Sequence, residues 1–191
     1  VVDTYGNAVS ITSTLNTNFG NKHVVEGAGF LLNNEMDDFS IKPGVANHWG
    51  LLGNEANAIE PNKRPLSSMT PTILIYDGVP IMTIGSPGGS KIITTVLQCI
   101  LNVIVHDMDI KDAVCAPRFH HQWLPENTIY IDPYGLRKDI INNLESRGHI
   151  IELYAGGAYM GVANGLSLIH ISSPRDRQKS RMAGSGCKKK G

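Results

Sequence analysis

The chain has 191 residues, 41% of them hydrophobic, which suits one compact domain with a sizeable core. Its net charge of zero conceals an asymmetry: residues 166–191 carry seven Lys or Arg and one acid, while the remainder carries a net charge of −6. The longest apolar stretch, Ile92–Val105, is interrupted by polar residues, so we expect no membrane span. A basic terminus can bind nucleic acid, but a solvated end is the commoner case, and we expect no nucleic-acid partner.

The first third of the chain combines one predicted strand with a long loop. Alternating β-branched residues predict a strand over Asn7–Thr14. A short apolar run, Gly27–Leu32, ends at a cluster of carboxylates and amides. Many Gly, Asn and Pro residues predict a loop over Pro43–Pro65, and a loop of that length inside a compact domain suggests function.

The rest of the chain predicts paired strands, helices, and then strands again. Asp77-Gly78-Val79 separates two strands as in a hairpin, and apolar residues three or four apart (Ile93, Leu97, Leu101 and Ile104) predict the long helix. This order of elements predicts an α+β layered sandwich over residues 1–165, with 166–191 as a basic tail that is disordered or non-native. The predicted strands are 72–76, 80–84, 128–131, 149–154 and 159–163, and the predicted helices are 90–106, 109–115 and 136–147.

A glycine-rich turn, Gly85-Ser86-Pro87-Gly88-Gly89-Ser90, joins a predicted strand to the long helix. Glycines permit a sharp turn, and the first N–H groups of a helix point outward without internal partners. Such a turn can hold an anion, or an oxyanion that forms during a reaction. It lacks the Gly-Lys-Ser/Thr ending of a P-loop, and an ordinary strand-to-helix turn is the alternative.

Two further clusters offer complementary polar groups. The segment Asn33–Ser40 is dense in carboxylates that can receive an ammonium group or calcium, although it lacks the EF-hand pattern and a solvated turn is the alternative. The hydroxyl pair Ser67-Ser68 can hold a carboxylate, and an ordinary Ser- and Pro-rich loop is the alternative. The adjacent His120 and His121 favour a structural role. No metal-ligand spacing appears, so we expect no metal and no cofactor.

Together these segments resemble the small subunit of gamma-glutamyltranspeptidase, in that family's order and spacing over roughly residues 1–165. The residues that carry the resemblance are Leu15-Asn16-Thr17, Leu31–Ser40, Lys63–Met69, Gly85–Ser90 and Ala116–His120.

The resemblance implies a partial N-terminal-nucleophile hydrolase-like αββα sandwich. Enzymes of this family cut their own precursor to expose a threonine, which attacks a gamma-glutamyl amide such as glutathione and forms an acyl-enzyme. Water or an acceptor amino acid then takes the glutamyl group. The resemblance also implies a heterodimer with the large subunit of the same precursor, which supplies an arginine to the substrate carboxylate, and a periplasmic or extracellular location.

The resemblance also implies residue roles. Thr14 corresponds to the hydroxyl that hydrogen-bonds the nucleophile. The family's ligands of the substrate α-amino group correspond to Asn16, Glu35 and Asp38, its carboxylate binders to Ser67 and Ser68, and its oxyanion-hole donors to Gly88 and Gly89.

The chain departs from the family pattern before Val1, and this departure changes the activity that we expect of it. The family's Thr-Thr-His-type segment lies about five residues before the point matching Val1, so we expect that the sequence is truncated before the nucleophile and that Val1–Gly191 alone is inactive. Two alternatives are a glutaryl-cephalosporin acylase of the same fold, or a non-catalytic fragment whose basic tail is a binding element. An acylase has no use for ligands of an α-amino group, so those ligands favour glutamyl.

Overall fold

The computed structural model describes residues 1–154 and 160–169, and these fall into two compact parts. One part is Ser13–Ser68, and the other joins Val1–Thr12 to the chain from Met69 onward. Apart from residues 166–169, the predicted basic tail lies outside the described residues. Within the described residues, no helix is long and apolar enough to cross a membrane.

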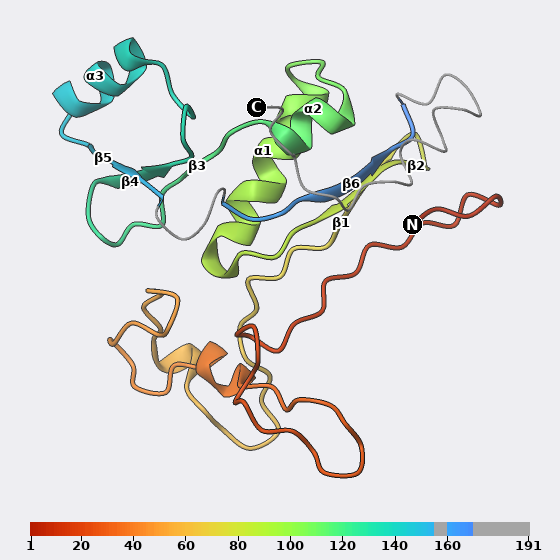
Figure 1. The fold of residues 1–191 in the computed structure, drawn as a ribbon, viewed down its shortest axis with the longest axis vertical. Helices are drawn as coiled ribbons and strands as arrows, with labels where there is room; N and C mark the ends of the chain where they lie inside the picture. Colours follow the sequence, from red (N-terminus) through yellow and green to blue (C-terminus); the bar gives the residue numbers. More distant parts are fainter. Residues whose placement is uncertain (155–159, 170–191) are drawn as a thin grey trace. The chain divides into compact units, whose positions relative to one another are not determined.

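The larger part contains a three-stranded antiparallel sheet in the order β1-β2-β6 (Figure 1). Strands β1 (Thr72–Tyr76) and β2 (Val79–Gly85) form the predicted hairpin, and β6 (Asn164–Ser167) pairs with the other edge of β2. Asp77 and Gly78 both have positive φ, 49° and 78°, as a tight hairpin turn with the right-handed strand twist requires. The hairpin prediction is therefore confirmed.

Helices cover one face of this sheet. A short 3-10 turn, η3 (Gly89–Lys91), leads into α1 (Ile92–Ile104), and α2 (Ile110–Cys115) follows with the Asp109 side chain capping its first turn. Both helix predictions are confirmed. The core is the apolar cluster formed by β2, α1 and α2: Met82, Ile84, Ile92, Val96, Cys99, Val103 and Ala113.

A second sheet, in the order β3-β4-β5, lies on the other side of α1 (Figure 1). Strand β3 (Phe119–His120) is antiparallel to β4 (Thr128–Ile131), and β5 (Ile150–Leu153) is parallel to β4. Helix α3 (Lys138–Ser146) makes the crossover that a parallel pair requires. The strand predicted over 159–163 is displaced, because β6 begins at Asn164, and residue 159 lies outside the described residues.

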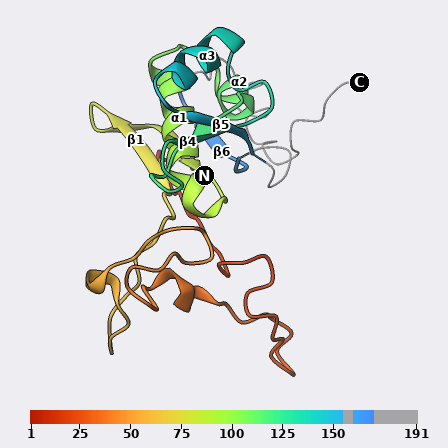
Figure 2. The ribbon, with the colours of Figure 1, turned by 90° about the vertical axis from the view of Figure 1, so that its left-hand side faces the viewer.

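The smaller part, 13–68, runs as long loops with two short 3-10 turns, η1 (Glu35–Asp38) and η2 (Glu55–Asn57), as Figures 1 and 2 show. The strand predicted over Asn7–Thr14 is wrong. Ala8 makes only an isolated bridge with Val2, and the Ser10 hydroxyl donates to the Ile84 carbonyl oxygen in place of a backbone ladder. β-branched alternation indicates strand propensity, but a strand also needs a partner with free backbone groups. The predicted α+β class is confirmed.

Candidate functional site

The first candidate element is the acidic turn η1 in the smaller part. Its sequence is Glu35-Met36-Asp37-Asp38, and Asn34 stands at its N-cap position. In a 3-10 helix the side chains at positions i and i+3 eclipse each other. Glu35 and Asp38 occupy such positions, so their carboxyl groups lie on the same side of the turn and influence one another's ionisation. The turn geometry thus converts a run of acids into one carboxyl pair.

Both carboxyl groups of this pair are harder to ionise than an exposed acid, and burial is the main cause. Burial raises the pKa of Glu35, and the hydrogen bond and charge of Asp38 raise it further. Burial also raises the pKa of Asp38, whereas its hydrogen bond from Glu35 acts in the lowering direction. An incoming cation would stabilise the fully ionised pair.

Asn16 lies directly beside the pair. Its main-chain N–H acts to lower the Glu35 pKa, against the effect of burial. Its side-chain amide donates to the Asn34 carbonyl oxygen at 3.1 Å. The indole Nε1 of Trp49 donates to Asn16 Oδ1 at 2.6 Å. The structure therefore brings three predicted residues together, Asn16, Glu35 and Asp38, and fixes the first from a loop 33 positions away.

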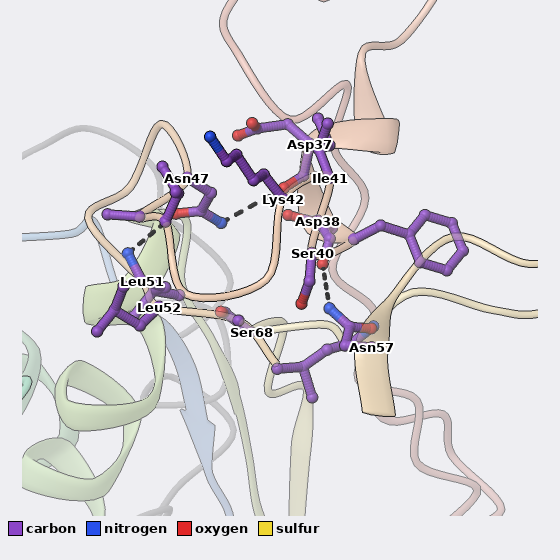
Figure 3. Close-up of a pocket in the computed structure, with 15 residues that line it drawn as sticks. Asp37, Asp38, Ser40, Ile41, Lys42, Asn47, Leu51, Leu52, Asn57 and Ser68 are labelled. Atoms are coloured by element: carbon purple, nitrogen blue, oxygen red, sulfur yellow. Dashed lines mark hydrogen bonds between the residues drawn. The ribbon is translucent and has the colours of Figure 1, made fainter. Parts of the chain in front are cut away.

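A cavity of about 210 Å³ opens next to this pair (Figure 3). Asp38 and Ser68 both line it, so one residue predicted to bind the substrate α-amino group and one predicted to bind its α-carboxylate share one cavity. Asn57 joins the segments that carry them: its amide donates to the Asp38 carbonyl oxygen at 2.7 Å, and its Oδ1 accepts the Leu66 N–H at 2.9 Å. Ser67 is not part of the lining, and its side chain is exposed.

Asn57 and Trp49 are the residues that the sequence analysis missed. Both lie in the predicted loop Pro43–Pro65, whose length was the only signal of a role. Asn57 bonds to main-chain groups, and Trp49 bonds to an amide far away in sequence. No local pattern encodes such partners.

The second candidate element is the glycine turn in the larger part, between β2 and η3. Gly88 has φ 145° and Gly89 has φ 57°, conformations that favour glycine at both positions. The Lys91 N–H bonds back to the Gly88 carbonyl oxygen at 3.1 Å, closing the turn. Neither the Gly88 nor the Gly89 N–H finds a backbone acceptor among the described residues. The turn therefore presents two donors at the start of a helix, the arrangement that suits an oxyanion.

Thr14 belongs to the smaller part, and Gly88 and Gly89 belong to the larger one. The exposed Thr14 hydroxyl accepts the Asn16 N–H at 2.9 Å, so it is oriented by the predicted amine-binding segment. Its predicted role toward a nucleophile stays a prediction, as do the assignments of Ser67 and Ser68 to a carboxylate.

His120 is buried, and its ring nitrogens contact Thr94 Oγ1 at 2.8 Å and Gln122 Oε1 at 2.9 Å. Burial lowers its pKa and the nearby Lys91 charge acts in the same direction, whereas the hydrogen bond with Gln122 acts to raise it. His121 is exposed. Across residues 1–154 and 160–169, no group of three His, Cys, Asp or Glu side chains is arranged to hold a metal ion.

Comparison with known proteins points to one family. The sequence model of gamma-glutamyltranspeptidase matches residues 1–180. The chain is 54% identical over 153 residues to the glutathione hydrolase proenzyme of Escherichia coli, covering 80% of this chain and 26% of that protein. It thus spans about a quarter of the length of the curated relatives it matches.

Comparison with solved structures also points to this family. A crystal structure of a mutant gamma-glutamyltranspeptidase from Helicobacter pylori superposes with a TM-score of 0.83 at 53% identity, covering 87% of this chain and 88% of that chain. A cephalosporin acylase from Bacillus halodurans is more distant, with a TM-score of 0.63 at 28% identity over 75% of this chain and 24% of that chain. The predicted N-terminal-nucleophile hydrolase-like fold is confirmed.

Proposed function

This chain belongs to the gamma-glutamyltranspeptidase family, and from that membership we propose that it supplies the glutamyl-binding and oxyanion-binding groups of a gamma-glutamyl transferase/glutathione hydrolase. Such an enzyme cleaves gamma-glutamyl amides through a threonine acyl-enzyme. It passes the glutamyl group to water or to an acceptor amino acid.

The observation that carries the proposal is the Glu35–Asp38 carboxyl pair beside Asn16. A gamma-glutamyl group has an α-ammonium, and that cation stabilises the ionised form of two neighbouring carboxyl groups whose pKa values are raised by burial. The Asn16 side-chain oxygen, which accepts the Trp49 indole N–H, has a second lone pair that can serve as a further acceptor. An ammonium ion has only donors, so a site made of acceptors matches it.

The other groups of the substrate have matching partners. Ser68 lines the cavity that Asp38 also lines, so its hydroxyl supports the assignment to the α-carboxylate. The N–H groups of Gly88 and Gly89 suit the carbonyl oxygen of the scissile amide. When a hydroxyl attacks that carbonyl carbon, negative charge develops on the oxygen, and fixed donors stabilise this charge more than the neutral ground state.

The proposed reaction has two steps. The threonine that the family resemblance places before Val1 attacks the γ-carbonyl, the C–N bond breaks, and the amine leaves with a proton. Water or an amino acid then attacks the resulting ester and regenerates the threonine hydroxyl. An N-terminal threonine provides both nucleophile and base, so Val1–Gly191 without it is expected to be inactive.

The proposal includes a partner and a location. Relatives of this chain are named glutathione hydrolase proenzymes, which supports a heterodimer between this small-subunit-like chain and the large subunit of the same precursor. We expect that large subunit to contribute a cation to the substrate carboxylate, because the only basic residue that lines the cavity in 13–68 is the exposed Lys42. By family resemblance the assembled enzyme is periplasmic or extracellular.

A glutaryl-cephalosporin acylase is the second candidate, since an acylase shares the fold. A glutaryl group lacks the α-amino group, so the acid pair would be buried beside a ligand with no cation to offset its charge. That cost favours a glutamyl substrate.

The test is to express the complete precursor, verify by mass that it is cleaved into two chains, and assay a gamma-glutamyl anilide. Turnover by the cleaved protein and none by purified Val1–Gly191 is the expected result. A correctly cleaved protein without turnover would refute the proposed function. Turnover by Val1–Gly191 alone would refute the placement of the nucleophile.

A further inference from the structure

The segment Met160–Gly161 packs against the glycine turn with no room for a side chain at Gly161. A Cβ atom built on Gly161 would lie 2.7 Å from Ser86 Oγ and 2.9 Å from the Pro87 carbonyl oxygen. A Cβ atom on Gly88 would lie 3.4 Å from the Gly161 Cα. The backbone at Gly161 is therefore the surface against which the turn rests.

The Asp132 carboxylate holds this segment from the other side. Asp132 is fully buried, its Oδ1 accepts the Met160 N–H at 2.7 Å, and its Oδ2 accepts the Arg118 N–H at 3.0 Å. The Asp132 N–H in turn donates to the Arg118 carbonyl oxygen at 2.8 Å. A buried carboxylate with two main-chain donors is well satisfied and fixes the groups that donate to it.

The Arg118 guanidinium completes the arrangement. Its Nη1 donates to the Met160 carbonyl oxygen at 3.0 Å, and its Nη2 donates to the Val114 carbonyl oxygen at the end of α2. Thr95 Oγ1, on α1, donates to the same Met160 carbonyl at 3.4 Å. Both polar groups of the Met160 backbone are thus bound by buried side chains, at 4% exposure for Arg118 and 0% for Asp132.

We propose that Asp132 and Arg118 are positioning residues for the glycine turn. Arg118 precedes β3 and Asp132 follows β4, so residues at the edge of the second sheet hydrogen-bond the Met160 backbone. Gly161, the next residue, packs against the turn that follows β2. The consequence for catalysis rests on the proposed function, because donors stabilise an oxyanion only where the turn holds them. The contacts by which Asp132 and Arg118 hold Met160, and by which Gly161 rests against the turn, are here called the clamp. The clamp itself does not depend on that function.

The clamp can be tested on this chain by replacing Gly161 with Ala and measuring amide exchange by NMR. The readouts are the Lys91 and Ile92 amides, which bond to the Gly88 and Gly89 carbonyl oxygens. We expect exchange roughly tenfold faster or more, since a populated open turn exposes both amides. The matched control is Gly78→Ala. Gly78 has a φ of 78°, similar to that of Gly161, and there is open space around its Cβ position. Unchanged Lys91 and Ile92 exchange in Gly161→Ala would overturn the clamp.

The catalytic consequence is tested in the cleaved two-chain enzyme with Gly161→Ala and Asp132→Asn, because Asn replaces one of the two acceptor oxygens with a donor. We expect both variants to displace the Gly88 and Gly89 N–H donors. This displacement should lower kcat by roughly 100-fold and leave KM within about threefold of the wild-type value. Gly78→Ala keeps the wild-type kcat. A loss confined to KM, or equal loss in Gly78→Ala, would contradict the positioning role. If Asp132→Asn does not fold, Gly161→Ala decides. If the wild type has no turnover, the proposed function fails while the exchange result still judges the clamp.

Discussion

Glu35 and Asp38 lie three positions apart in a single 3-10 turn, and burial raises the pKa of both carboxyl groups. A nearby cation stabilises the ionised form of such carboxyl groups. An ammonium ligand beside Glu35 and Asp38 would therefore lower both pKa values and favour proton release. Binding and proton release are coupled by this geometry.

The first prediction concerns the pH dependence of stability. Because the folded-state pKa values of the pair lie above their ordinary values of 4.5 and 3.8, the folded chain binds a proton more tightly than the unfolded chain. The contribution to stability is therefore fully present below the ordinary values and is lost as pH rises through the raised values. Denaturant unfolding at a series of pH values measures this. Glu35→Gln should flatten the profile in that window, whereas Glu55→Gln, at an exposed acid of the same part, should not. Equal profiles for the wild type and Glu35→Gln would contradict the raised pKa of Glu35.

A second prediction concerns Asn57, which ties the Asp38 carbonyl to the Leu66 N–H. Asn57→Ala removes both bonds, one at a half-buried carbonyl and one at the exposed Leu66, and should cost about 1–3 kcal/mol in the free energy of unfolding. Asn18→Ala, at an exposed asparagine of the same part, should cost less than about 0.5 kcal/mol. Equal costs in urea unfolding would show that Asn57 does not join the two segments.

A third prediction uses two adjacent isoleucines of α1. Ile92 is 5% exposed and belongs to the core cluster, whereas Ile93 is 51% exposed. Ile92→Ala should destabilise the chain by about 2–5 kcal/mol, and Ile93→Ala should cost less than about 1 kcal/mol. Calorimetry on the isolated chain compares them. A larger loss at Ile93 would mean that the helix buries its other face.

These residues also show what the sequence can predict. The repeat at Ile93, Leu97 and Leu101 locates the helix correctly, yet the buried residues are its neighbours, including Val96 and Cys99. Helix α1 is apolar around most of its surface, so periodicity identifies the helix but not its core face. The Asp77-Gly78 hairpin was predictable because its turn chemistry is local. The strand over Asn7–Thr14 failed because strand pairing is not local.

The candidate site likewise has some features that the sequence predicts and others that require the folded structure. Density of acids and glycines in the sequence indicated the candidate ammonium site and the candidate oxyanion turn, and family resemblance named Asn16, Glu35 and Asp38. The pairing of Glu35 with Asp38 required the 3-10 geometry of η1, and the supports from Asn57 and Trp49 required folded loops. The amide and indole groups of these two residues have many possible partners, and only the fold selects among them.

The most direct test of the account is the preference of the cleaved two-chain enzyme for a gamma-glutamyl anilide over a glutaryl anilide, measured as the ratio of kcat/KM values. The two substrates differ by the α-ammonium that the Glu35–Asp38 pair is assigned to bind. The wild type should favour the glutamyl substrate by at least about tenfold, in line with a charge-assisted hydrogen bond, and Asp38→Asn should reduce that ratio toward one through a higher KM for the glutamyl substrate. Glu55→Gln should keep the wild-type ratio. Equal rates on both substrates, or an undiminished ratio in Asp38→Asn, would contradict the assignment of this turn to the glutamyl ammonium.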